Sequence, residues 1–229
     1  MLRIPTTLPA LLFVCCASAH IHKVVPGSRA LLSALSIAAD GDTVLVGSGT
    51  YAEGTLTIDR PLVLMGNGWP VIDGGGKGEV IVVKSPRVTI TGLVVRGTAI
   101  SDMNDNAGIK CISSSDIRII GNRVEGCFFG IYLSSVARAT VADNRVIGDP
   151  ATAENRRANG IHLWKCAQVD ILRNTVLNHR DGIYLEFVTD SRISQDTTAF
   201  NMRYGLHFMF SHRDSYTHNL FHDNGAGVA

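Results

Sequence analysis

A four-residue pattern that recurs from residue 108 to the end of the chain constrains the fold more than any other feature. Each copy begins with a glycine followed by an apolar or small residue, at Gly108, Gly130, Gly160, Gly182, Gly205 and Gly227, so successive copies start 22, 30, 22, 23 and 22 residues apart. A second column keeps the same rhythm, at Asn122, Asn144, Asn174, Asp196 and Asn219. A fixed period of roughly 20 to 30 residues is typical of stacked repeats, in which each unit buries its apolar face against its neighbours.

The content of the repeat indicates which kind of stack it forms. Short β-rich runs, such as residues 131–133 and 140–142, alternate with turns made of Gly, Asn, Asp and Ser. No run within the repeats has the length and 3.6-residue period of an amphipathic helix, and the dense leucine pattern of leucine-rich repeats is absent. We therefore predict an all-β, right-handed parallel β-helix with regular coils of about 22 residues over residues 108–229.

The residues before the repeats divide into three parts. Residues 1–19 contain Arg3, an apolar core and an Ala-Ser-Ala site, which is typical of a secretory signal peptide that is too short to span a membrane. Residues 20–229 are predicted to form a single β-helix domain, and residues 28–39 an α-helix with Ser28 as its N-cap, which covers the less regular first coils. The sequence ends two residues after Gly227, so we expect the β-helix to be truncated at its C-terminus.

Charge and cysteine content exclude some functions. Without residues 1–19 the chain has 20 Lys and Arg against 20 Asp and Glu, and a neutral chain is a poor nucleic-acid binder. Beyond the signal peptide, no apolar segment is long enough to cross a membrane. Three cysteines remain, Cys111, Cys127 and Cys166, and this odd number indicates no complete disulfide framework.

The outer face of the last coils concentrates groups that can bind metals or partners. Strand alternation places the first and third residues after each glycine in the core and the second and fourth on the outside. In three successive coils these outer positions hold His162, Trp164, Tyr184, Glu186, His207 and Met209, within one or two ladder spacings of each other. Imidazole with thioether is the ligand set of copper, and thioether favours Cu(I). Alternatively, the same side chains pack along the ladder or form a protein interface.

The long repeat step contains a polar loop over residues 148–157. Functional insertions in repeat proteins occur in such loops, on one face of the stack. Its adjacent Arg156 and Arg157 are candidates for docking a partner protein, and a solvated loop is the alternative.

An enzymatic function is weighed because residues 32–54 resemble the opening of secreted β-helix proteins that cleave acidic polysaccharides. Hydrolysis needs paired carboxylates on one wall, yet the Asn-Thr-Asp, Asp-Asp, Gly-His-Gly and Arg-x-Lys motifs shared by those hydrolases are all absent. A lyase would need clustered acids, and Glu186 is alone in its column. We predict that the chain is not an enzyme. A carbohydrate-binding or polysaccharide-cleaving β-helix, in which Trp164 and Tyr184 stack on sugars, is the alternative, and a pure scaffold is a third.

Three segments of the last coils carry a specific resemblance. They read Ala-Asn-Gly-Ile-His-Leu-Trp-Lys-Cys from residue 158, Arg-Asp-Gly-Ile-Tyr-Leu-Glu-Phe-Val from residue 180 and Arg-Tyr-Gly-Leu-His-Phe-Met-Phe-Ser from residue 203. They resemble NosD, a family of periplasmic β-helix proteins of the nitrous oxide reductase maturation system. The resemblance covers residues 20–229, generically up to about Gly97 and at motif level from Gly160 onward.

The resemblance implies a non-enzymatic, periplasmic role in copper or copper–sulfur delivery. It further implies three partners, namely the ABC transporter NosF/NosY, the copper chaperone NosL and nitrous oxide reductase. The exposed motif residues of the family fall on the six outer positions named above. We therefore predict transient Cu(I) binding at His162, Glu186, His207 and Met209, and partner contacts at Trp164, Tyr184, Arg156 and Arg157.

Overall fold

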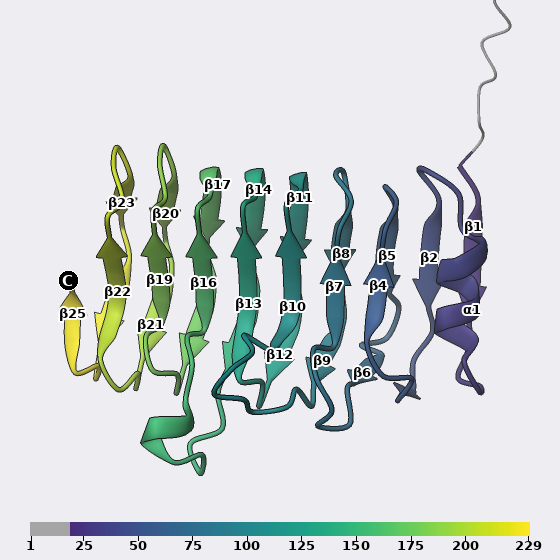
Figure 1. The fold of residues 1–229 in the computed structure, drawn as a ribbon, viewed down its shortest axis with the longest axis horizontal. Coiled ribbons are helices and arrows are strands. Elements are labelled where there is room, and N and C mark those ends of the chain that lie inside the picture. The colour runs from purple at the N-terminus through teal and green to yellow at the C-terminus, as the bar shows by residue number, and fades with distance from the viewer. Residues whose placement is uncertain (1–18) are drawn as a thin grey trace, which may run out of the picture.

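The computed structural model describes residues 19–229, which form a parallel β-helix: its coils stack along one axis and build three parallel sheets (Figure 1). The predicted signal peptide falls almost entirely on residues 1–18 and so lies outside the described residues. Nine coils are visible as the nine strands of the first sheet, and the paired strands run parallel in every sheet. The prediction of an all-β parallel β-helix is thus confirmed.

The first coil contributes only β1, and each of the eight later coils contributes one strand to each sheet. The first sheet comprises β1 (Ile21–Val24), β2 (Thr43–Val46), β5 (Val63–Gly66), β8 (Thr89–Thr91), β11 (Ser115–Ile120), β14 (Ala137–Ala142), β17 (Ala167–Leu172), β20 (Arg192–Ser194) and β23 (Ser215–Thr217). The second sheet comprises β3 (Thr50–Tyr51), β6 (Val71–Asp73), β9 (Val94–Arg96), β12 (Arg123–Glu125), β15 (Arg145–Ile147), β18 (Thr175–Leu177), β21 (Thr197–Ala199) and β24 (Leu220–His222). The third sheet comprises β4 (Leu56–Ile58), β7 (Ile81–Val83), β10 (Ala107–Ile112), β13 (Phe129–Ser134), β16 (Ile161–Trp164), β19 (Ile183–Glu186), β22 (Tyr204–Met209) and β25 (Ala226–Val228).

The glycine column opens the strands of the third sheet and explains the repeat. The residues one and three places after each glycine pair in register from coil to coil, as in Ile131 with Ile161 and Ile161 with Ile183, and from Gly108 to Gly182 their side chains are fully buried. A Cβ on Gly160 would collide with the Val176 side chain and lie 2.8 Å from the Gly182 carbonyl oxygen. The corner between the second and third sheets is therefore too tight for a side chain.

The asparagine column forms a buried ladder of hydrogen bonds at the turn between the first and second sheets. The Asn144 amide nitrogen donates to the Ile119 carbonyl at 2.8 Å and to the Asn174 Oδ1 at 3.0 Å, and the Asn144 backbone N–H donates to the same oxygen. Asn122 bonds to Asn144 in the same way. Because these amides satisfy backbone groups that turn away from the sheets, they link successive coils inside the core.

One short helix, α1 (Ala30–Ile37), packs against the first coils at the N-terminal end of the stack (Figure 1). The prediction of Ser28 as N-cap is wrong. Arg29 precedes the helix in a left-handed conformation with φ 55°, and Ser28 lies one residue too early. Instead, the Glu53 carboxylate accepts hydrogen bonds from the backbone N–H groups of Leu31 and Leu32, at 3.0 and 2.9 Å. A carboxylate from the next turn of chain thus satisfies the first turn of the helix.

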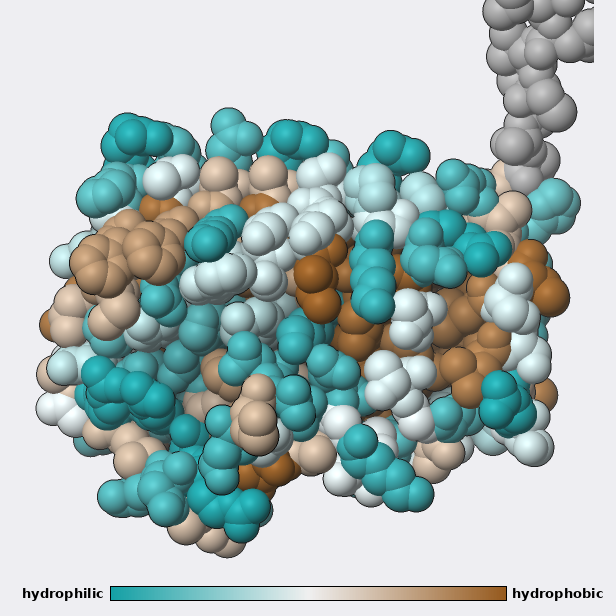
Figure 2. All heavy atoms as spheres, viewed as in Figure 1, coloured by the Kyte–Doolittle hydropathy of each residue, from teal (hydrophilic) through white to brown (hydrophobic). Residues whose placement is uncertain are grey.

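The loop after β15 projects from the lower edge of the stack and contains the 3₁₀ helix η1 (Glu154–Arg156) (Figure 1). Much of its surface is hydrophilic (Figure 2). Within residues 19–229, no helix has the length and apolar character needed to cross a bilayer.

Candidate functional site

Two rows of side chains run along the outer face of the third sheet, and we call them the inner row and the outer row. β16, β19 and β22 place His162, Tyr184 and His207 in register in the inner row. The same pairing aligns Trp164, Glu186 and Met209 in the outer row. The strand phase drawn from the sequence therefore holds, and all six predicted residues lie on one face.

The inner row is buried, although its side chains point away from the core. Tyr132, which pairs with His162, continues the row into the preceding coil. The exposed fractions are 7% for Tyr132, 9% for His162, 8% for Tyr184 and 8% for His207. Successive ring centroids are 4.7, 4.8 and 4.7 Å apart, so each ring covers the next along the ladder. The expectation that these rings are exposed is wrong for this reason. The outer row, by contrast, is half-buried and remains accessible.

His162 lies in an apolar, hydrogen-bonded position. Its Nδ1 is 3.0 Å from the Asn159 amide nitrogen, and Phe129 and Tyr132 pack against its ring. Burial, followed by the nearby Arg180 charge, lowers the pKa of His162 to about 3. The imidazole is thus neutral at physiological pH, which is the form that binds metals.

His207, Met209 and Glu186 gather around the side chain of Tyr184. The Tyr184 hydroxyl donates to the Met209 sulfur at 3.2 Å and lies 3.5 Å from Glu186 Oε2. The His207 ring packs on the Tyr184 ring at 4.7 Å between centroids. Burial raises the pKa of Tyr184, so the phenol stays protonated and is available as a donor. One imidazole, one thioether and one carboxylate therefore share a single neighbour.

The structure divides the four predicted metal ligands into two positions. His162 and His207 lie in the coils on either side of Tyr184, two coils apart, and the Tyr184 ring separates them. Within residues 19–229, His, Cys, Asp and Glu side chains form no group of three or more suited to a metal. A copper site on this face therefore depends on the Met209 thioether. The three cysteines in this range are free and buried, and burial raises the pKa of Cys166 to about 11 and that of Cys127 to about 12.

A groove of about 510 Å³ lies beside the His162 end of the face. Its walls include Tyr132, His162, Trp164 and Glu186, together with Asp105 and Lys110. The Lys110 ammonium forms an ion pair with Glu79 at 3.0 Å and also donates to the Asp105 carbonyl oxygen at 2.9 Å. Lys165 lies over the half-buried Trp164 ring at 4.2 Å.

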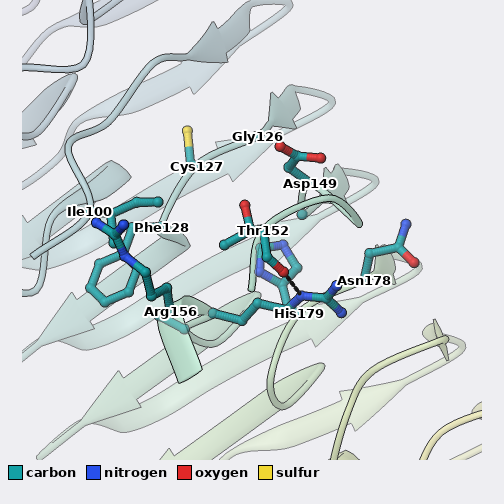
Figure 3. Close-up of a pocket in the computed structure, with 12 residues that line it drawn as sticks. Ile100, Gly126, Cys127, Phe128, Asp149, Thr152, Arg156, Asn178 and His179 are labelled. Carbon is teal, nitrogen blue, oxygen red and sulfur yellow. Dashed lines mark hydrogen bonds between the residues drawn. The ribbon is translucent and has the colours of Figure 1, made fainter. Parts of the chain in front are cut away.

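The two arginines of the projecting loop have different environments. The Arg157 guanidinium donates to the Thr152 and Pro150 carbonyl oxygens, at 2.9 and 2.6 Å, so it holds the loop closed. Arg156 is exposed. Beneath them lies a cavity of about 20 Å³ with room for a single water molecule (Figure 3). The Cys127 thiol there points away from His179, whose pKa burial lowers to about 4 (Figure 3).

Two polar residues behind the inner row were not among the predicted site residues. Asn159 bonds to His162, and Asp181, which is fully buried, lies 3.5 Å from His207 Nδ1. Both directly precede a glycine of the repeat, where the two preceding coils have Ala107 and Phe129. The change from apolar to polar at a position next to the core was the signal that could have revealed them.

The fold and this face together define a parallel β-helix that carries stacked aromatic, imidazole and thioether groups on one sheet. Residues 142–229 match the family model described as periplasmic copper-binding protein (NosD). A protein of Pseudomonas aeruginosa is 36% identical over 152 residues, and one of Stutzerimonas stutzeri is 30% identical over 137 residues. Each is named probable ABC transporter binding protein NosD. The resemblance to NosD is thus confirmed, and the chain is a relative of these proteins.

The matches cover a larger share of this chain than of the two relatives. The aligned regions cover 65% and 59% of this chain but 35% and 31% of the two relatives, so the chain spans about a third of their length. Solved structures share the fold. An alginate lyase from a Paenibacillus species aligns with a TM-score of 0.52 at 15% identity, covering 90% of this chain and 97% of its own. The Dettilon tailspike protein aligns with a TM-score of 0.61 at 13% identity, covering 88% of this chain and 43% of its own. At these identities the likeness concerns the β-helix alone.

Proposed function

We propose that this β-helix is part of a NosD-type periplasmic accessory protein that takes part in copper, or copper–sulfur, delivery to nitrous oxide reductase. The description of the matching family as periplasmic and copper-binding supports this function. The names of the two curated relatives support an ABC transporter as partner, which we take to be NosF/NosY. NosL as copper donor and the reductase as acceptor complete the proposal. The role is non-enzymatic.

The observation that carries the proposal is the gathering of His207, Met209 and Glu186 around Tyr184. All four residues lie in the segment that matches the NosD model. A thioether and an imidazole suit Cu(I), whereas the carboxylate and the phenol can balance charge and hold water at the entrance. Met209 and Glu186 are half-buried and Tyr184 is nearly covered, so the ion enters from the outer row. His162 forms a separate donor position on the other side of Tyr184.

Partner contacts are assigned by accessibility. Trp164 and Arg156 reach the surface and are proposed to touch a partner protein directly. Tyr184 and Arg157 are engaged inside the molecule, by Met209 and by loop carbonyls respectively, so they act by supporting those surfaces. Aromatic and arginine side chains are the types that carry most binding energy at protein interfaces.

An anaerobic Cu(I) competition titration tests the metal site. The wild-type protein is expected to bind one Cu(I), and the His207→Ala/Met209→Ala variant to bind at least tenfold more weakly, because it loses both soft donors. The matched control is His218→Ala/Met103→Ala, which removes one imidazole and one thioether from exposed positions elsewhere. A wild-type protein that does not compete for Cu(I), or equal losses in the two variants, contradicts the proposal.

The groove beside Trp164 supports carbohydrate binding as a second candidate function, since an aromatic ring near acids can stack on a sugar. The copper function predicts no measurable heat when neutral or acidic hexasaccharides are titrated into the protein in a calorimeter. Binding that disappears in Trp164→Ala, but persists in the exposed control Phe200→Ala, would favour the carbohydrate function instead.

A further inference from the structure

Asp181 is a buried acid at a position of the repeat where the fold does not require an acid. It directly precedes Gly182, is fully buried, and lies in the same place in its repeat as Ala107 and Phe129. Its Oδ1 accepts a hydrogen bond from the Tyr204 backbone N–H at 3.3 Å and lies 3.8 Å from Arg203 Nε. Its Oδ2 has no hydrogen-bond partner in the part of the chain that the structure describes. An apolar residue would fill the position without this loss of hydration.

A second buried polar atom without a hydrogen-bond partner among the described residues lies close to Asp181 Oδ2. His207 Nδ1 lies 3.5 Å from Asp181 Oδ2, and it too has no hydrogen-bond partner among residues 19–229. The His207 ring is held between Tyr184 and Tyr204, with centroids 4.7 Å away on each side. A shortening of about 0.5 Å would turn this contact into a charge-assisted hydrogen bond. The two buried atoms thus satisfy each other only if Nδ1 carries the proton.

We propose that Asp181 is a positioning residue that holds His207 in the Nδ1–H tautomer and so presents its Nε2 lone pair as a copper ligand, an inference that rests on the proposed function. A neutral imidazole has one protonated nitrogen, and a hydrogen bond at one nitrogen decides that the other is free to bind a metal. With Nδ1 turned inward to Asp181, Nε2 lies on the opposite edge of the ring.

The comparison with His162 shows why the carboxylate matters. His162 has the amide of Asn159 at its Nδ1, 3.0 Å away. An amide can donate from nitrogen or accept at oxygen, so Asn159 fits either tautomer of His162. A carboxylate only accepts and therefore selects Nδ1–H. This difference assigns His207, rather than His162, as the imidazole prepared for copper.

Nitrogen-15 NMR of the metal-free protein measures the His207 tautomer directly. Wild type is expected to show Nδ1 protonated, whereas Asp181→Ala shifts the population towards Nε2–H because the acceptor is gone. The matched control, Asp196→Asn, changes another buried acid, which bonds to the asparagine ladder, and leaves the tautomer unchanged. An Nε2–H tautomer in wild type, or an unchanged tautomer in Asp181→Ala, overturns the inference. The wild-type measurement decides the question even where Asp181→Ala does not fold.

The Cu(I) titration provides the second readout. Asp181→Ala is expected to lower the Cu(I) affinity 10- to 100-fold, as is typical when a group that orients a ligand is removed, and Asp196→Asn to leave it unchanged. Failure of the wild type to bind Cu(I) refutes the copper function, while the tautomer still tests the Asp181–His207 contact. Wild-type binding that is unaffected by Asp181→Ala overturns the inference and leaves the copper function standing.

Discussion

Replacement of Asp196 by asparagine is expected to raise the free energy of unfolding by about 2 to 3 kcal/mol at pH 7. Asp196 is the acid in a column that otherwise consists of Asn122, Asn144, Asn174 and Asn219. It is 1% exposed, and its Oδ2 has no hydrogen-bond partner within the described residues. Burial is the main cause that raises the pKa of Asp196 to about 6, so the folded protein is destabilised by ionisation of this group.

The ladder shows what the amide would gain. The side-chain nitrogens of Asn144, Asn174 and Asn219 donate to the carbonyls of Ile119, Val141 and Ile193 respectively. In the register of the first sheet, the carbonyl that corresponds to these at Asp196 is that of Ile171. An ionised carboxylate cannot donate to it, whereas an asparagine amide can, and its Oδ1 can still accept from Asn174 as Asp196 does now.

The pH dependence of the difference in unfolding free energy between wild type and Asp196→Asn tests this explanation. Between pH 4 and 6 the native state keeps the Asp196 proton that the unfolded state releases, so the stability of the wild type falls as pH rises through this window. The stability of the Asp196→Asn variant does not fall in this way, because asparagine does not ionise. Urea unfolding of both proteins from pH 3.5 to 8 should therefore give a stability difference that grows up to about pH 6 and then levels off. A difference that is constant with pH, or that favours the wild type at pH 7, would contradict the explanation.

The coil phase could be predicted from sequence because it depends on two local constraints. Gly160 is needed where a Cβ would meet the next coil, and Ile131, Ile161 and Ile183 are needed where strands face the core. Both recur from Gly108 onward, so their spacing alone reveals the fold of these coils. The helix start could not be placed in this way, because its first N–H groups are satisfied by Glu53, a residue more than twenty positions away.

The candidate site could be predicted only in part. Register brought His162, Tyr184 and His207 to one row, but the sequence did not show that their rings would cover one another and separate the two histidines. Burial of an outward side chain depends on the rotamers of its neighbours, which periodicity does not encode. Asp181 was missed for a similar reason, since its importance arises from a contact with His207 in the next coil.

Removal of the Asn144 side chain is expected to lower the free energy of unfolding by about 3 to 5 kcal/mol, because it interrupts a buried ladder of hydrogen bonds. Asn144 Oδ1 accepts from the Asn122 backbone N–H and amide, and its own amide donates to Ile119 and Asn174. Asn144→Ala would leave the Asn122 backbone N–H buried without its acceptor, at about 1 to 3 kcal/mol, and would also remove the hydrogen bonds of the Asn144 amide and create a cavity.

Urea unfolding of Asn144→Ala beside Arg145→Ala separates this effect from a general sensitivity of the turn. Arg145 is the next residue, but its side chain is exposed, so its removal should change stability much less. Because each coil contacts only its neighbours, the loss at Asn144 should also expose the amide protons of β12 and β15 to hydrogen exchange before those of β2 and β5. Equal destabilisation by the two variants, or uniform exchange along the stack, would show that the coils are not held together by this ladder.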